Sequence, residues 1–152
     1  SAREMQQACD AAFGDAGLVV MSAAVADYTP EKPAVQKIKK QGDRMGLDLV
    51  PTNDILSEMG KRKRKGQTLV GFALETENEM ANAADKLSRK HLDFLVLNSL
   101  RDEGAGFGHD TNKVTLLSAN GMARAFPLKS KTEVARDLVD ALTATLQQNK
   151  RS

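Results

Sequence analysis

The sequence is poor in cysteine and in aromatic residues, and each shortage excludes a class of protein. It has one cysteine, Cys9, together with five phenylalanines, one tyrosine and no tryptophan. A single cysteine excludes an internal disulfide and a zinc site with paired C-x-x-C ligands. Cys9 lies at helical spacing from Met5 and Phe13, which predicts a packed thiol rather than a nucleophile. So few aromatic side chains also disfavour a surface that stacks on nucleic-acid bases.

Long hydrophobic runs are also scarce. No stretch is long enough to span a bilayer and no signal-peptide pattern is present, so we expect a cytoplasmic protein without a membrane partner. A chain of 152 residues buries roughly 70% of its unfolded surface on folding and needs no disulfide or structural metal. We therefore expect residues 1–152 to form a single domain.

The sequence lacks a large excess of charge of either sign, because the formal net charge is only +2. Locally, however, residues 31–65 hold ten lysines and arginines against five acidic residues. This local excess fits a small polyanionic ligand at least as well as nucleic acid, which usually meets a broader basic face. Within it, the run Lys61–Lys65 ends a predicted helix, where positive charge stabilises the helix dipole. We favour this structural explanation over a nucleic-acid patch.

Helical and strand-like patterns alternate along the chain, which is typical of an α/β fold with right-handed parallel crossovers. The sequence predicts a three-layer α/β domain with a mostly parallel sheet and an edge β-hairpin. Thr52 or Asn53 is expected to cap the second helix. The expected helices are residues 2–13, 54–63, 78–90 and 131–147, and the expected strands are 17–24, 68–73 and 94–98. One expected hairpin joins 36–40 to 45–50 across Gln41-Gly42-Asp43, and a second spans 113–126. The last helix should turn these side chains inward: Val134, Leu138, Val139, Leu142 and Leu146.

An acidic residue and a lysine cluster follow the first apolar strand. Residues 17–26 are almost continuously apolar, which suits a central parallel strand buried on both faces. Asp27 would then lie beyond the carboxyl end of the sheet, where ligands bind in open α/β folds. There it could meet a ribose hydroxyl or a hydrated Mg²⁺, while Lys37, Lys39 and Lys40 neutralise phosphate charge. The alternative is that Asp27 caps a turn and the lysines lie on a solvated strand edge.

Two lysines on a later helix add to this pattern. Lys86 and Lys90 are four residues apart and share a helix face, where an anion between them would relieve their repulsion. A solvent-exposed face balanced by Asp85 and Asp93 is the alternative. The glycine-rich stretch 104–108 is not a dinucleotide fingerprint, because a strand rather than a helix is predicted after it.

Several motifs stand in a characteristic order between residues 17 and 117. They are Ala23-Ala24-Val25-Ala26-Asp27-Tyr28, Lys37-Ile38-Lys39-Lys40, Asp54-Ile55-Leu56, Gly71-Phe72-Ala73-Leu74-Glu75-Thr76, Lys86 with Lys90, residues 93–98, and Phe107 with Asp110, Asn112 and Val114. In these motifs and their spacing the chain resembles the phosphopantothenoylcysteine synthetases, which are ligases of coenzyme A biosynthesis. The resemblance implies a Rossmann-like domain. The family's amino-terminal strand, glycine-rich turn and asparagine-bearing motif have no counterpart here, so the chain would be the nucleotide-binding portion of a synthetase domain.

The resemblance implies an acid activation followed by amide formation. Bacterial members condense 4′-phosphopantothenate with cysteine. They use CTP and Mg²⁺ to form an acyl-cytidylate, which the cysteine amine attacks, and they release pyrophosphate and CMP. Most are fused to an upstream flavin-dependent decarboxylase, so FMN is expected only in that attached domain. A homodimer is also implied, with the Lys37 hairpin near the partner subunit.

The resemblance also assigns roles to residues of this sequence. The backbone of Ser22, Ala23 and Ala24 would meet the cytosine, and Asp27 would bind the nucleotide or its metal ion. Lys37 would stabilise charge growing on the triphosphate, which makes it the expected catalytic residue, on a segment that can cover the intermediate. The rest of the nucleotide site would be Val50, Pro51, Thr52, Asn53, Phe72, Lys86 and Lys90.

Two other functions stay open on the sequence alone. A nicotinamide-dependent oxidoreductase would share the α/β pattern, although the glycine fingerprint is absent from this sequence. A nucleic-acid-binding module would rest on Lys61–Lys65 alone. Steeply salt-dependent binding of DNA or RNA would favour the second function, whereas selective protection by CTP would favour the ligase.

Overall fold

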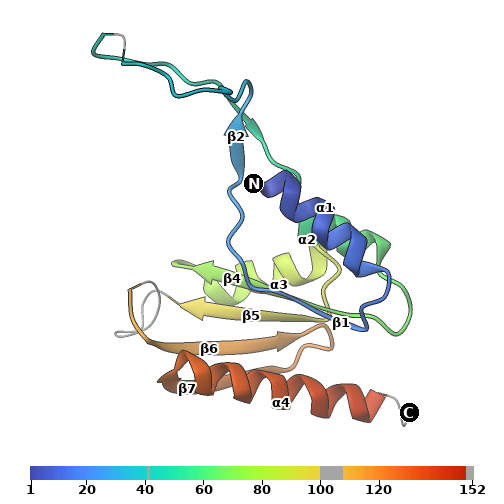
Figure 1. Cartoon of the computed structure of the whole chain (residues 1–152). Coiled ribbons are helices and arrows are strands. Elements are labelled where there is room, and N and C mark those ends of the chain that lie inside the picture. Colours follow the sequence, from blue (N-terminus) through green and yellow to red (C-terminus); the bar gives the residue numbers. More distant parts are fainter. Residues whose placement is uncertain (41, 100–107, 150–152) are drawn as a thin grey trace.

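The structure is a computed structural model that describes residues 1–40, 42–99 and 108–149 (Figure 1). Helices and strands alternate in it as the sequence patterns predict. None of the described helices is long and apolar enough to cross a membrane. The helices are α1 (Ala2–Phe13), α2 (Ile55–Arg62), α3 (Glu79–Arg89) and α4 (Lys131–Asn149), and the strands are β1 (Leu18–Met21), β2 (Tyr28–Pro30), β3 (Leu49–Pro51), β4 (Thr68–Glu75), β5 (Phe94–Ser99), β6 (Thr111–Ser118) and β7 (Ala123–Ser130).

Five strands form the main sheet, in the order β1-β4-β5-β6-β7. β4 pairs in parallel with both β1 and β5, whereas β6 lies antiparallel between β5 and β7. Four of these five strands therefore run in one direction, and the predicted mostly parallel sheet with an edge hairpin is confirmed. The turn between β6 and β7 includes Gly121, whose φ of +86° favours glycine.

Helices cover both faces of the sheet, with α1, α2 and α3 on one side and α4 on the other (Figure 1). Alternate side chains of the central strands face these two layers. In β4, Leu69 belongs to the core under α1, α2 and α3, whereas Val70 belongs to the core under α4. Leu95 and Val96 of β5 divide between the two cores in the same way. All four side chains are at most 1% exposed, and burial of each contributes about 1.5–3 kcal/mol. This arrangement confirms the three-layer prediction.

In the described sheet β1 is an edge strand, so the prediction of a central strand buried on both faces is wrong. Its Val20 side chain is 45% exposed, and Phe72 on the neighbouring β4 is 37% exposed.

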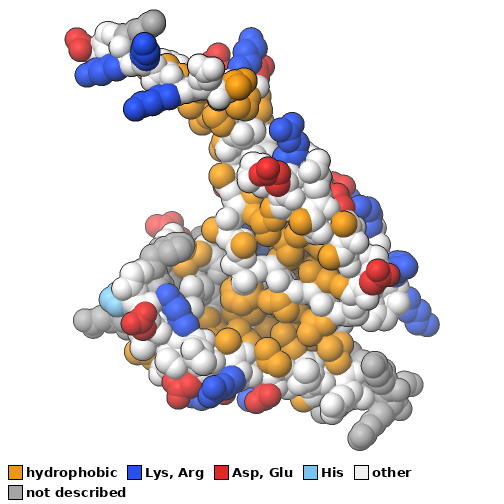
Figure 2. Space-filling view, viewed as in Figure 1, with side chains coloured by type: hydrophobic (Ala, Val, Ile, Leu, Met, Phe, Trp, Pro, Cys, Tyr) orange, Lys and Arg blue, Asp and Glu red, His pale blue; other side chains and the backbone are white. Residues whose placement is uncertain are grey.

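The contacts of α4 with the sheet are mainly to β6 and β7. Figure 2 shows hydrophobic side chains gathered above α4, on the half of the sheet face that this helix leaves uncovered. Val139, predicted to point inward, is 54% exposed because it lines this open half. The other predicted inward positions are buried or half-buried: Val134, Leu138, Leu142 and Leu146.

Asp54 caps α2, so the prediction of Thr52 or Asn53 as its cap is wrong. Asp54 Oδ1 accepts a hydrogen bond from Ser57 N at 3.0 Å. The Thr52 hydroxyl is unavailable for this role because Oγ1 donates to Ala26 O at 2.5 Å. The helix therefore begins one residue later than the apolar pattern alone predicts.

Residues 31–40 and 42–48 form an arm that projects from the body of the molecule (Figure 1). At its base β2 pairs antiparallel with β3, and Glu31 N donates to Asp48 O at 2.9 Å. No strand occurs in the described part of the arm, so the predicted hairpin of 36–40 with 45–50 is wrong. A two-stranded ladder is marginal in water without a surface to pack on, and the described side chains of the arm are exposed.

Candidate functional site

A cavity of about 260 Å³ lies at the carboxyl end of β1. The loop after β1 forms one wall, the residues at the start of α2 form a second, and side chains from β4 and from the end of α3 complete it. The structure therefore brings together sequence-predicted segments that lie far apart in the chain. The lining residues are Met21, Ala23, Ala24, Val25, Asp27, Thr52, Asn53, Asp54, Ile55, Leu56, Phe72 and Lys90.

Hydrogen bonds join the first two walls. Thr52 N donates to Asp27 O at 2.8 Å, and the Thr52 hydroxyl donates to Ala26 O. Ala23 and Ala24 have only methyl side chains, so a ligand can approach the backbone of this loop. The cavity thus offers backbone polar groups and the Asp27 carboxylate on a loop that is held in place.

Lys90 and Asp54 form an ion pair in the cavity wall. Lys90 Nζ lies 2.8 Å from Asp54 Oδ2, and Asp54 Oδ1 accepts from Ser57 N. Burial raises the pKa of Asp54, but the hydrogen bonds from Lys90 and Ser57 outweigh burial and hold this pKa below its ordinary value of 3.8. The carboxyl is therefore ionised at neutral pH and holds an ammonium group beside the cavity.

Lys86 pairs with Glu75 outside the cavity lining. Lys86 Nζ lies 2.5 Å from Glu75 Oε1, and Asn82 Nδ2 donates to Glu75 Oε2 at 3.3 Å. The Glu75 side chain is only 11% exposed, whereas the Lys86 side chain is 36% exposed, so only the carboxylate of the pair is largely removed from solvent. In this structure Lys86 and Lys90 thus do not share one anion, because each binds its own carboxylate.

Other sequence-predicted site residues lie away from the cavity lining. Ser22 lines a groove on the α4 side of the sheet, and Val50 and Pro51 belong to β3. Lys37 lies in the exposed arm. Conversely, Asp54 is a lining residue that the sequence prediction of the site did not include. Its position in the Asp-Ile-Leu motif is the signal that could have found it.

The side chains that line the cavity decide whether the predicted metal ion could bind there. Across residues 1–40, 42–99 and 108–149, no group of three or more histidine, cysteine, aspartate or glutamate side chains is placed to hold a metal. Mg²⁺ is usually bound by one or two carboxylates together with phosphate oxygens and water. Two carboxylates line the cavity, Asp27 and Asp54, and Asp54 is paired with Lys90. The Asp27 carboxylate therefore fits a metal ion that arrives with a nucleotide.

A family model for the DNA/pantothenate metabolism flavoprotein C-terminal domain matches residues 1–146. The chain belongs to this family. The match includes every segment that lines the cavity, so the candidate site lies within the part of the chain that the family model matches.

The chain is shorter than the curated relatives that it matches. It is 40% identical over 148 residues to the coenzyme A biosynthesis bifunctional protein CoaBC of Bacillus subtilis, which covers 97% of this chain and 36% of that protein. It is 50% identical over 139 residues to a cysteine/cysteine sulfinic acid decarboxylase of an unknown prokaryotic organism, which covers 91% of this chain and 39% of that protein. The chain thus spans less than two fifths of the length of these relatives.

Solved structures similar to this family domain confirm the Rossmann-like fold. The C-terminal domain of a CoaBC protein has a TM-score of 0.77 and 33% identity, over 97% of this chain and 64% of that chain. A Cab2 mutant in complex with phosphopantothenate-cysteine has a TM-score of 0.70 and 18% identity, over 100% of this chain and 53% of that chain. The second likeness shows the fold alone.

The first three residues of the basic run 61–65 form ion pairs with acidic residues of the same chain. Lys63 Nζ lies 2.8 Å from Asp93 Oδ2, which also accepts from Leu69 N at 2.7 Å. These contacts support the structural explanation of the run over a nucleic-acid patch. The further ion pairs of the run join Lys61 to Glu58 and Arg62 to Asp10.

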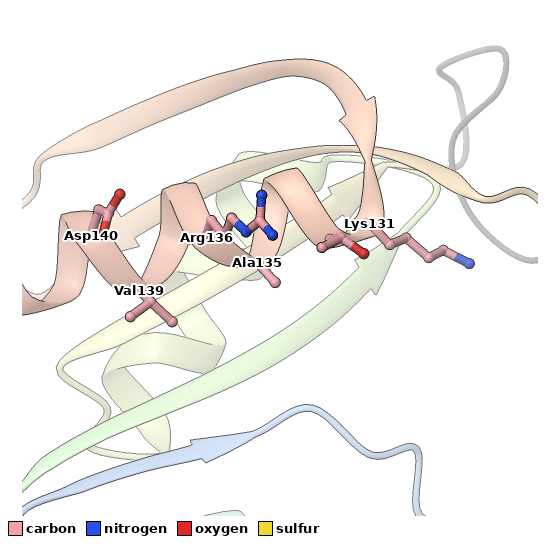
Figure 3. A pocket seen from close by; sticks show the side chains of 6 residues that line it. Lys131, Ala135, Arg136, Val139 and Asp140 are labelled. Atoms are coloured by element: carbon pink, nitrogen blue, oxygen red, sulfur yellow. The ribbon is translucent and has the colours of Figure 1, made fainter.

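A larger hollow lies on the surface of α4, lined by residues that include Arg136 and Val139 (Figure 3). It adjoins a groove of about 440 Å³ over the uncovered half of the sheet, where Val20 and Phe72 contribute to a mainly hydrophobic lining. Neither hollow is lined by Asp27 or by the lysines predicted to bind phosphate. The smaller cavity at the end of β1 is therefore the candidate functional site.

Proposed function

We propose that this chain is the nucleotide-binding portion of a phosphopantothenate–cysteine ligase that uses CTP. The cavity carries the proposal, because residues expected to bind the nucleotide meet there from the β1 loop, the start of α2, β4 and the end of α3. The CoaBC relatives are named coenzyme A biosynthesis bifunctional proteins, which supports a role of this kind in that pathway. A carboxylic acid, an amine and a nucleotide would thus be the reactants.

In the proposed reaction the carboxylate of 4′-phosphopantothenate attacks the α-phosphorus of CTP. The bond from that phosphorus to the bridging oxygen breaks, so pyrophosphate leaves and an acyl-cytidylate forms. The amine of cysteine then attacks the acyl carbon, loses a proton and expels CMP as the amide forms. The backbone at Ala23 and Ala24 would hold the cytosine, and Phe72 would pack against the nucleotide.

The remaining groups of the site would bind the triphosphate. Lys90 places an ammonium group beside the cavity, and Asp27 would hold Mg²⁺ together with phosphate oxygens. When bound, Mg²⁺ would neutralise negative charge on the phosphate groups. Lys37 would reach the triphosphate when the arm folds toward the cavity, to which its base is joined through Thr52 and Asp27. A closed arm would also shield the acyl-cytidylate from water.

We further propose that residues outside this chain complete the ligase site, and that the whole protein includes a decarboxylase and forms a homodimer. About a third of the solved CoaBC C-terminal domain has no counterpart here, since the match covers 64% of it. The bifunctional name of the longer relatives supports an attached decarboxylase, which would carry FMN. A homodimer would cover the apolar side chains of the arm, where Val35 is 100% and Met45 is 66% exposed.

Isothermal titration calorimetry with Mg·CTP and Mg·ATP tests the proposed function. We expect CTP to bind about tenfold more tightly than ATP, because hydrogen bonds to the base would be lost with adenine. NAD⁺ and a single-stranded RNA oligonucleotide are matched probes for the two alternatives. Tighter binding of NAD⁺, steeply salt-dependent RNA binding without CTP binding, or a folded sample that binds no nucleotide would contradict the proposal.

A further inference from the structure

Asp54 uses its two carboxylate oxygens for two separate tasks. Oδ1 accepts from Ser57 N at 3.0 Å and caps α2, whereas Oδ2 accepts from Lys90 Nζ at 2.8 Å. The helix itself is anchored, because Ile55 is 4% and Met59 is 1% exposed. The cap therefore fixes the carboxylate, and a lysine bonded to a fixed carboxylate is held in one place.

The position of Lys90 favours a carboxylate partner for its ammonium group. Its backbone packs against α2, since a Cβ atom built at Gly60 would lie 1.9 Å from Lys90 O. From there the Lys90 side chain, which is 21% exposed, reaches Asp54 at the first turn of the same helix. An ammonium group in this partly buried place loses hydration, and the carboxylate replaces part of that hydration.

We propose that Asp54 is a positioning residue that presents the Lys90 ammonium group to the phosphate groups of the nucleotide. This inference rests on the function proposed above. An ammonium group has three N–H donors, so the bond to Asp54 leaves donors for phosphate oxygens. Because the side chain is already ordered in the free protein, binding does not incur the full cost of ordering it.

Three explanations of the Asp54–Lys90 pair predict different results. Electrostatics alone predicts tighter binding of an anionic nucleotide when the negative charge of Asp54 is removed. A purely structural link between α2 and α3 predicts altered stability with unaltered affinity. Positioning of Lys90 predicts weaker binding, and only in a protein that contains Lys90.

Asp54→Asn is the informative variant, because asparagine caps helices about as well as aspartate but carries no charge. By calorimetry we expect Mg·CTP to bind this variant about three- to tenfold more weakly than the wild type. Lys90→Gln should weaken binding about tenfold or more. The double variant should bind no more weakly than Lys90→Gln alone, since Asp54 acts through Lys90.

Two further variants serve as controls. Glu58→Gln removes the exposed ion pair with Lys61 on the same helix and should bind Mg·CTP like the wild type. Asp54→Ser keeps a capping oxygen and should repeat the loss seen with Asp54→Asn. Unchanged or tighter binding by both Asp54 variants, or additive losses in the double variant, would overturn this inference while leaving the proposed function in place. Absence of CTP binding by the wild type would overturn both.

Discussion

Substitution of Lys37 by glutamine is expected to weaken binding of Mg·CTP about ten- to hundredfold while changing the free energy of unfolding by less than about 0.5 kcal/mol. Lys37 lies in the exposed arm, so the folded state depends little on it. In the proposed closed state its ammonium group meets the triphosphate. A hydrogen bond between charged groups contributes about 1.5–3 kcal/mol, which corresponds to the expected loss of affinity. Calorimetry measures the affinity, and urea unfolding measures the stability.

Lys32→Gln is the matched control for Lys37→Gln. Lys32 lies in the same arm and its side chain is 90% exposed, so this substitution removes the same charge from a residue without a predicted role. We expect its affinity for Mg·CTP to stay within about twofold of wild type, since exposed charges act weakly at physiological salt. An equal loss in both variants would show that the arm contributes only general positive charge.

Substitution of Gly60 by alanine is expected to destabilise the protein by about 3 kcal/mol, although alanine is the better helix former by about 1 kcal/mol. Gly60 is buried in α2, and an added Cβ atom would lie 1.9 Å from the backbone oxygen of Lys90 and 3.4 Å from His91 Cβ. A backbone atom cannot rotate away as a side chain can. The helix and the end of α3 must therefore separate, which would also displace Lys90 from Asp54. Urea unfolding measures the loss.

Gly14→Ala is the matched control for Gly60→Ala. Gly14 ends α1 with φ −57° and ψ −37°, which alanine adopts freely. Apart from its chain neighbours and the adjoining helix backbone, no atom of the described residues lies within 4 Å of an added Cβ. This variant should be as stable as the wild type or more stable by up to about 1 kcal/mol. If Gly60→Ala were equally stable, the close packing of α2 against the end of α3 would be wrong.

Much of the fold is predictable from the sequence because burial leaves a clear pattern. The apolar residues of β4 and β5 form short, nearly continuous runs between polar segments, and both strands occur as predicted. The apolar run before Asp27 forms only a four-residue edge strand, because a run of this kind does not reveal how many neighbours the strand has. The sequence also predicts a hairpin of 36–40 with 45–50 across Gln41-Gly42-Asp43, but the described side chains of the arm are exposed and no surface of the described chain covers them.

The sequence predicts the residues of the candidate site that lie in one motif directly after a strand, but it does not predict contacts between segments that are far apart in the chain. Ala23, Ala24 and Asp27 follow a strand end directly, and all three line the cavity. Helical spacing relates Lys90 to Lys86, but the ion-pair partner of Lys90 is Asp54. These two residues are too far apart in the sequence for a periodic pattern to relate them. The role of Lys37 stays a prediction, since the arm holds it away from the cavity lining.

The most direct test of the nucleotide site is nuclear magnetic resonance of the isotope-labelled chain during titration with Mg·CTP. We predict the largest amide shift changes at the residues that line the cavity, with small changes on the hollow of α4 near Arg136 and along the basic run 61–65. Changes concentrated on α4 or on the basic run, with none at the cavity, would contradict the account. The amides to follow are those of Ala23, Ala24, Asp27, Thr52, Asn53 and Phe72.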